Sequence, residues 1–252
     1  MGSGKAGSVN MMTRDVTVTE NNFLSIFSDA VMLYEAAKGC ADLDLQCALA
    51  KSSVLSVNYA LEAAANSFME SVAISANLKA QVDKFRTLEK FDFVLQYHTD
   101  EQLNNGDAWV QNVKNLIDHR NNFVHPKIKK NKIQVATLIE PGQPPRHQAI
   151  QQPAKKGEDL KPKLLGPDSE LYSHKDAAEA LVRMTKFLNA FISKWGIKYE
   201  EAELFLFQTW DGSLGSRPIM FRSHQVKTLV RNDHFLKIEF MGLHGLVAAD
   251  SD

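Results

Sequence analysis

Arg120, Asn121 and His125 are the residues whose types and spacing point most directly to chemistry. An arginine guanidinium presents a fixed fork of donors that suits a phosphate, and a histidine exchanges protons near neutral pH. Pro126 follows His125, and because proline disfavours helical backbone at the preceding residue, we expect a helix to end there. The negative end of the helix dipole favours the protonated form of His125 at this position.

Arg120 falls on the apolar stripe of the expected helix, together with Trp109, Val113 and Leu116. Burying an unpaired charge is costly, so the guanidinium needs a partner. Two interpretations are open. In the first, Arg120 pairs with an acid such as Glu62 and serves only the fold; in the second, it binds a phosphate.

The spacing of Arg120 and His125 bears on how they can act together. On an ideal helix, residues five positions apart lie roughly 140° apart around the axis and about 7.5 Å apart along it. The two side chains therefore do not face each other. Convergence requires either unwinding at Pro126 or the same pair from a second subunit across a two-fold axis, which favours a homodimer.

Two further groups of polar residues can contribute to the same site. Asn58, Glu62 and Asn66 are spaced by four and share one helix face, which either points at Arg120 or is solvated. A run of basic residues directly after His125 either holds a nucleic-acid backbone or forms a solvated loop. Its members are Lys127, Lys129, Lys130 and Lys132.

Composition excludes several classes of function. Cys40 and Cys47 are too few for a disulfide framework or a zinc site, and the histidines show no metal-binding spacing, so we expect no metal, no cofactor and a reducing, cytoplasmic compartment. Apolar runs fall far short of the ~18 residues of a membrane span, which predicts no membrane partner. The net charge of -1 gives no global attraction to nucleic acid, so such binding needs a local patch.

The periodicity of apolar residues predicts five helices that position these side chains. They cover about residues 20–38, 42–72, 78–97, 107–125 and 173–195, with a break in the third near Asp92. Asp42 or Asp44 and Ser173 are candidate N-caps, and Gly196 is a candidate end of the fifth helix. The second helix is Ala-rich and lacks Gly and Pro, which predicts that it is the longest.

The rest of the chain divides around this helical domain of residues 20–195. Residues 1–19 are expected to be a disordered tail, and residues 196–252 a small α+β appendage. Seven of the eight prolines fall within a basic, Pro-rich insert of about residues 126–172, in which only residues 133–140 resemble a strand and the remainder a flexible loop. The fold class is therefore mainly α, with a long insert and a small C-terminal addition.

The stretch from Arg120 to His125 resembles the motif of HEPN domains, in which an Arg, commonly followed by Asn, precedes a His at the end of a late helix. A long second helix carrying Glu62 and Asn66 matches as well. The resemblance covers roughly residues 20–195. It implies a HEPN-like helical bundle that dimerises and brings both Arg/His pairs into one cleft.

The resemblance also implies an activity, the metal-independent cleavage of RNA, in members that are often toxins or antiviral defence effectors restrained by an antitoxin or another protein. His125 would act as general base or acid, Arg120 would stabilise the phosphorane charge, and Asn121 would orient the phosphate or His125. The implied product ends in a 2′,3′-cyclic phosphate. Lys127 stands where some members carry a Tyr that a partner enzyme modifies, so the sequence departs from that mode of neutralisation.

Two alternatives stand beside the ribonuclease. A noncatalytic module would bind RNA, a nucleotide or a partner protein at the same cleft, and the near-neutral net charge suits it. A purely structural interaction protein would require the cleft to be blocked.

Overall fold

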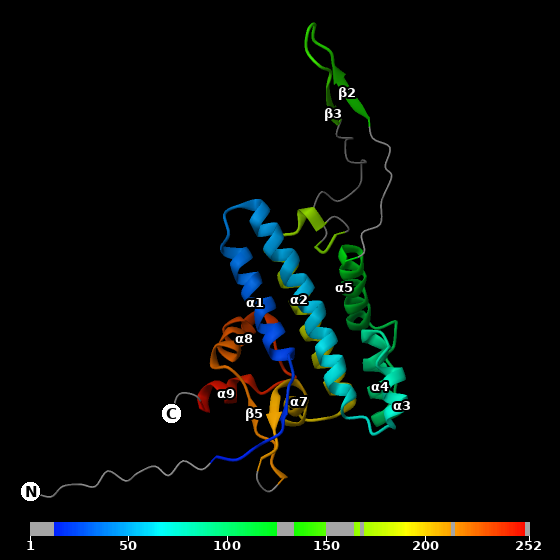
Figure 1. Ribbon diagram of the computed structural model, residues 1–252, viewed down its shortest axis with the longest axis vertical. Coiled ribbons are helices and arrows are strands. Elements are labelled where there is room, and N and C mark those ends of the chain that lie inside the picture. Colours follow the sequence, from blue (N-terminus) through cyan, green and yellow to red (C-terminus); the bar gives the residue numbers. More distant parts are fainter. Residues whose placement is uncertain (1–12, 125–133, 150–163, 167–168, 213–214, 250–252) are drawn as a thin grey trace, which may run out of the picture.

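A computed structural model describes residues 13–124, 134–149, 164–166, 169–212 and 215–249 (Figure 1). Helices dominate these segments, as the sequence predicted. The helices are α1 (Phe23–Gly39), α2 (Leu43–Met69), α3 (Ala76–Val82), α4 (Thr87–Thr99), α5 (Ala108–Val124), the 3-10 helix η1 (Ser169–Leu171), α6 (His174–Trp195), α7 (Tyr199–Leu206), α8 (Ser223–Leu236) and α9 (Leu243–Ala249). Among them, none is long and apolar enough to cross a membrane.

Helices α1 and α2 form a hairpin that carries one side of the core (Figure 1). Asp42 begins α2 by accepting a hydrogen bond from the Leu45 N–H at 2.9 Å, which selects one of the two candidate caps. Small residues let the two helices approach closely, and the Ser53 hydroxyl donates to the Ala30 carbonyl at 2.7 Å. Helix α2 is the longest described helix, as its Ala-rich sequence predicted.

The prediction of one helix over residues 78–97 with a break near Asp92 was wrong in the position of the break. The chain instead leaves α3 at Val82 and enters α4 at Thr87. The Glu89 carboxylate accepts the Arg86 N–H at 2.7 Å and so starts a new helix. Asp92 lies inside α4. Its carboxylate accepts a hydrogen bond from the Leu103 N–H at 2.6 Å, which fixes the loop that follows the helix.

Helix α6 is the central packing element against which α2, α4 and α5 rest. Ser173 caps it together with the N3 residue Asp176, and Gly196, in the left-handed region at φ 77°, ends it as predicted. Its aromatic side chains interlock with those of the neighbouring helices, and Phe91 lies 4.9 Å from the ring centroids of both Phe187 and Phe191. This packing fixes the position of α4 against α6.

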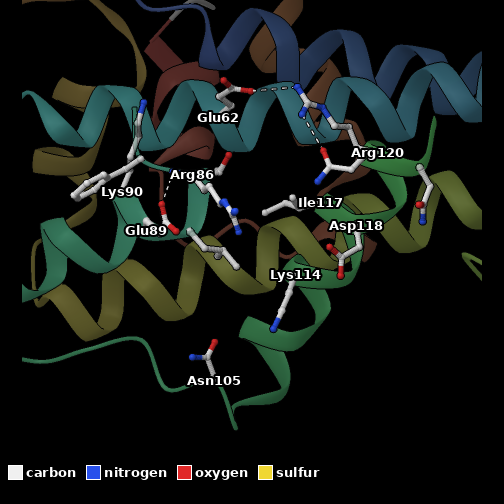
Figure 2. Close-up of a pocket in the computed structure, with 14 residues that line it drawn as sticks. Glu62, Arg86, Glu89, Lys90, Asn105, Lys114, Ile117, Asp118 and Arg120 are labelled. Atoms are coloured by element: carbon white, nitrogen blue, oxygen red, sulfur yellow. Dashed lines mark hydrogen bonds and ion pairs between the residues drawn. The ribbon is translucent and has the colours of Figure 1, made fainter. Parts of the chain in front are cut away.

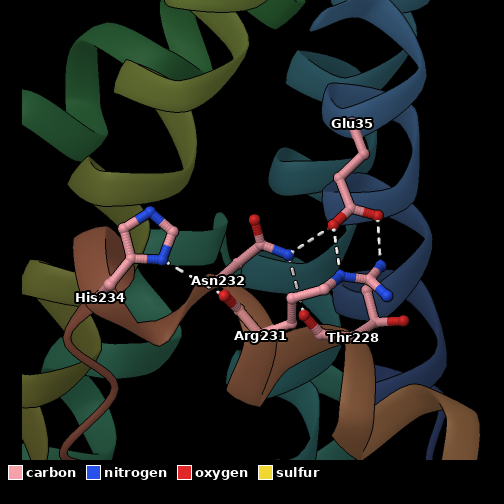
Figure 3. A network of polar contacts seen from close by, with 5 residues as sticks. All are labelled: Glu35, Thr228, Arg231, Asn232 and His234. Atoms are coloured by element: carbon pink, nitrogen blue, oxygen red, sulfur yellow. Dashed lines mark hydrogen bonds and ion pairs between the residues drawn. The ribbon is translucent and has the colours of Figure 1, made fainter. Parts of the chain in front are cut away.

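Residues after Gly196 pack on the same core instead of standing apart. Phe240 contacts Phe23 of α1 at 6.1 Å between ring centroids, and α8 lies along α1. Figure 3 shows the polar contact that joins them, in which the Glu35 carboxylate accepts hydrogen bonds from Arg231 and from Asn232 at 2.8 Å. The C-terminal segment is therefore a part of the helical body.

Two small antiparallel sheets complete the described fold. Strands β1 (Val18–Thr19), β4 (Gln208–Trp210) and β5 (Ile219–Met220) pair in the order β1-β4-β5, so residues 18–19 of the expected disordered tail form a strand. Within the insert, β2 (Val135–Leu138) confirms the predicted strand. It pairs with β3 (Arg146–Ala149), which the sequence analysis had assigned to loop, and the hairpin lies beyond the ends of the helices (Figure 1).

Candidate functional site

A pocket of about 740 Å³ lies between α2, α4 and α5 and contains part of the predicted site (Figure 2). Its lining is mixed in charge, with four basic and three acidic side chains. The lining residues are Glu62 of α2, residues 85–90 at the start of α4, Asn105, and Lys114, Ile117, Asp118 and residues 120–122 of α5. The volume falls in the range of small-molecule and cofactor sites.

Arg120 and Glu62 face each other across this pocket from α5 and α2 (Figure 2). An Arg120 Nη atom lies 3.8 Å from a Glu62 Oε atom, and the side chains are 29% and 49% exposed. The other Nη of Arg120 donates to the Asn121 Oδ1 at 3.1 Å, and the guanidinium carbon lies 6.0 Å from the Tyr59 ring centroid. The ion pair is too long for a hydrogen bond, so the guanidinium is held loosely.

The three polar residues of α2 do not act as one stripe. Glu62 reaches Arg120, whereas Asn66 accepts a hydrogen bond from the Lys90 ammonium of α4 at 2.7 Å. Asn58 is 6% exposed, its amide donates to the Val54 carbonyl, and its Oδ1 has no partner in the described part of the chain. The structure therefore brings Glu62, Arg120 and Asn121 together and leaves Asn58 in the core.

His125 and the predicted RNA-binding residues Lys127, Lys129, Lys130 and Lys132 lie outside the described residues. Helix α5 is described up to Val124, which follows Arg120 by one turn and precedes His125 directly. Asn121 and Asn122 are exposed at this end of the helix and line the pocket.

Contacts with the segment before α6 hold the end of α5 in place. The Tyr172 hydroxyl lies 3.2 Å from the His119 Nδ1, and the Tyr172 ring packs edge-on against Phe123 at 5.8 Å. Burial lowers the pKa of His119, and the charge of Arg183 lowers it further against the opposing effect of Asp118. His119 therefore anchors α5 through Tyr172 and does not line the pocket.

Sequence reasoning missed the basic residues that α4 contributes, above all Lys90. This lysine is only 8% exposed, although its type predicts a solvated position. The signal was present, because Lys90 precedes the core residues Phe91 and Val94 by one and four positions and so lies on the buried side of α4. Tyr59 was also missed; it is 44% exposed and lies three residues before Glu62, on the same face of α2.

No group of three His, Cys, Asp or Glu side chains that could hold a metal ion occurs in the described segments. Comparisons with family models, with curated proteins and with solved structures returned no match to this chain. The site is therefore interpreted from its own geometry and from the motif at the end of α5.

Proposed function

We propose that this protein is a metal-independent endoribonuclease of the HEPN kind, in which Arg120, Asn121 and His125 act on a phosphodiester of RNA. The observation that carries the proposal is the position of Arg120. Its guanidinium comes from the last two turns of α5 and lines a pocket of nucleotide size, and the carboxylate that pairs with it, Glu62, lies 3.8 Å away.

Energetics favour exchange of Glu62 for a phosphate at Arg120. A partly exposed ion pair of this kind contributes about 0–1 kcal/mol. Hydrogen bonds between a guanidinium fork and a phosphate are charge-assisted and can be bidentate, with about 1.5–3 kcal/mol for a hydrogen bond to a charged group. A phosphate entering the pocket can therefore displace the Glu62 carboxylate without large rearrangement.

The proposed reaction uses the 2′-hydroxyl of the RNA as the nucleophile. A histidine removes its proton, the 2′ oxygen attacks the phosphorus, and the bond to the 5′ oxygen of the next nucleotide breaks. A second proton donor protonates that leaving oxygen, which gives a 2′,3′-cyclic phosphate and a 5′-hydroxyl end. His125 takes the base or acid role, Arg120 stabilises the negative charge that develops on the phosphorane, and Asn121 orients the phosphate.

A homodimer is part of the proposal, because one chain supplies a single Arg120 and a single His125. Two-fold symmetry would place both pairs in one cleft and provide one histidine as base and the other as acid. Positions 120 and 125 of one helix lie roughly 140° apart around its axis, so the two side chains of one chain do not face each other. In the dimer, the second chain would supply the partner that each side chain lacks.

A second candidate function is noncatalytic binding of RNA, a nucleotide or a partner protein at the same pocket. The observation that favours it is the Glu62 carboxylate, which lies 3.8 Å from the Arg120 guanidinium and offsets its charge. Such a module needs no proton transfer, so it would not depend on His125.

Cleavage of total RNA in EDTA distinguishes the two candidates. We expect the wild type to cut, and both Arg120→Ala and His125→Ala to lose at least a hundredfold in rate, since each removes a group that acts in the transition state. Arg217→Ala and His224→Ala are matched controls, because both residues are exposed and lie outside the pocket. RNA binding without cutting by any variant would support the noncatalytic module, and equal cutting by all would contradict the proposal.

A further inference from the structure

Lys90 is a buried cation on the wall of the pocket and forms no ion pair within the described chain. Its side chain lines the pocket and extends toward α2 (Figure 2). The residue is 8% exposed, and the ammonium donates to the Asn66 Oδ1 at 2.7 Å. Within the described chain, no carboxylate forms an ion pair with it. An amide oxygen offers a dipole and no charge, and buried charges in proteins are normally paired.

The three carboxylates of the pocket are poorly placed to supply that charge. Glu62 is already in contact with Arg120. Glu89 accepts the Arg86 N–H at the start of α4, which is where a carboxylate stabilises a helix N-terminus. Asp118 is exposed on α5 and forms no ion pair with Lys90 in the residues that the structure covers.

Arg86 adds a second cation on the same side of the pocket. It precedes Lys90 by one helical turn, is exposed, and forms no side-chain ion pair within the described segments. Its side chain points toward Ile117 of α5, across the pocket (Figure 2). The wall built by α4 therefore presents two cations, and neither forms an ion pair in the segments that the structure describes.

The spacing on α2 relates this wall to Arg120. Glu62 contacts Arg120 and Asn66 contacts Lys90, and these two α2 residues are four positions apart. Four helical residues rise about 6 Å, so Arg120 and Lys90 contact α2 at points about one turn apart. Adjacent phosphates along an extended nucleic-acid strand have a comparable separation.

We infer that Lys90, with Arg86 beside it, binds a second phosphate of a single-stranded RNA, one nucleotide along the strand from the phosphate at Arg120. The inference rests on the proposed function and names Lys90 as a substrate-binding residue. Apolar side chains of Phe85, Leu88 and Ile117 in the same lining give the intervening nucleoside a surface to pack on. The phosphate supplies the Lys90 ammonium with the negative charge that the Asn66 amide lacks.

The test measures binding of a 2′-O-methyl RNA oligonucleotide, which cannot be cleaved because its 2′ oxygen is blocked, as a function of salt. Lys90→Met keeps the buried chain and removes the charge, Lys90→Arg restores a charge, and Arg86→Gln changes an exposed residue. Lys38→Met, in the last turn of α1, is the control because it lies outside the pocket. Thermal unfolding verifies that each variant is folded.

We expect Lys90→Met to weaken binding by about tenfold and to reduce the slope of log affinity against log salt by about 0.7, the value for one phosphate contact on a single strand. Arg86→Gln should weaken binding and reduce the slope in the same direction, Lys90→Arg should keep the wild-type slope, and Lys38→Met should change neither quantity.

The outcomes separate this inference from the proposed function. Wild-type affinity and slope in both Lys90→Met and Arg86→Gln, with weaker binding by Arg120→Ala, would overturn the Lys90 site and leave the ribonuclease proposal standing. Loss of binding in Lys90→Met and Arg86→Gln with full RNA cleavage by Arg120→Ala would support the phosphate site and overturn the assigned role of Arg120. Failure of the wild type to bind the oligonucleotide would overturn the Lys90 site, while cleavage of total RNA judges the ribonuclease independently.

Discussion

Glu62 and Arg120 lie 3.8 Å apart across the pocket between α2 and α5, in a contact that neutralises the guanidinium without forming a hydrogen bond. Both side chains are partly exposed, so water and ions compete with the pair. The arrangement agrees with the first interpretation of Arg120, in which it pairs with Glu62. It is also compatible with the second, because a weak pair is readily exchanged for a phosphate.

The Glu62–Arg120 pair gives a first prediction. Glu62→Gln removes a carboxylate that competes with and repels an incoming phosphate, so affinity for the uncleavable RNA should rise by up to about fivefold. The free energy of unfolding should change by less than about 1 kcal/mol. Glu70→Gln is a matched control at the C-cap of the same helix, since Glu70 pairs with Lys79 away from the pocket. Weaker RNA binding by Glu62→Gln would show that the carboxylate positions Arg120 for the ligand.

The anchoring of α5 by Tyr172 gives a second prediction. The Tyr172 hydroxyl contacts the His119 Nδ1 and donates to the Gly166 carbonyl, each at 3.2 Å. Tyr172→Phe removes these contacts and keeps the ring against Phe123, so it should cost about 1 kcal/mol and lower Tm by about 2–4 °C. A calorimetric scan measures both, with Tyr97→Phe as the control, because Tyr97 is 45% exposed and its hydroxyl makes only a long hydrogen bond, of 3.4 Å, to the Ala73 carbonyl. An unchanged Tm would mean that the hydroxyl does not hold α5.

The contact between α1 and α8 gives a third prediction, which concerns pH (Figure 3). Burial alone raises the pKa of Glu35, but hydrogen bonds from Arg231 and Asn232 outweigh it, so the pKa lies below the ordinary value of 4.5. The unfolded chain therefore takes up this proton first as the pH falls. The stabilisation is present above about pH 4.5 and is lost as the pH falls through the folded-state pKa.

Glu35→Gln should accordingly destabilise the protein at pH 7 by about 1 kcal/mol, a figure reduced for the partial exposure of the pair. The difference from the wild type should shrink when urea unfolding is repeated near pH 3. Glu239→Gln, an exposed position, serves as the control. A difference that stays constant with pH would show that the carboxylate charge does not stabilise this contact.

Local signals made the main helices predictable from sequence. Asp42 and Ser173 accept hydrogen bonds at helix starts, and Gly196 adopts the left-handed backbone that ends α6, so these boundaries depend on residues within one turn. The break before α4 was misplaced because Glu89 both belongs to a helical pattern and caps a new helix. A single-sequence pattern does not separate these two roles.

Long-range packing made the rest unpredictable. The burial of Lys90 and Asn58 depends on which helix covers each face, and Asn58 and Glu62 differ in environment although they are one turn apart. The packing of Phe240 on Phe23 joins residues more than two hundred positions apart, which no local periodicity reveals. Strand β3 includes polar residues such as Arg146 and Gln148, and its pairing with β2 defines it.

Attack by the RNA 2′-hydroxyl is tested directly by comparing, in EDTA, two oligonucleotides that differ only by a 2′-deoxy substitution at the nucleotide where the wild-type protein cuts. We predict that the all-RNA substrate is cut to a 2′,3′-cyclic phosphate and a 5′-hydroxyl, and that the 2′-deoxy substrate stays intact because it lacks the nucleophile. Cleavage of both substrates at the same position, or products ending in a 3′-hydroxyl and a 5′-phosphate, would contradict an Arg120/His125 ribonuclease.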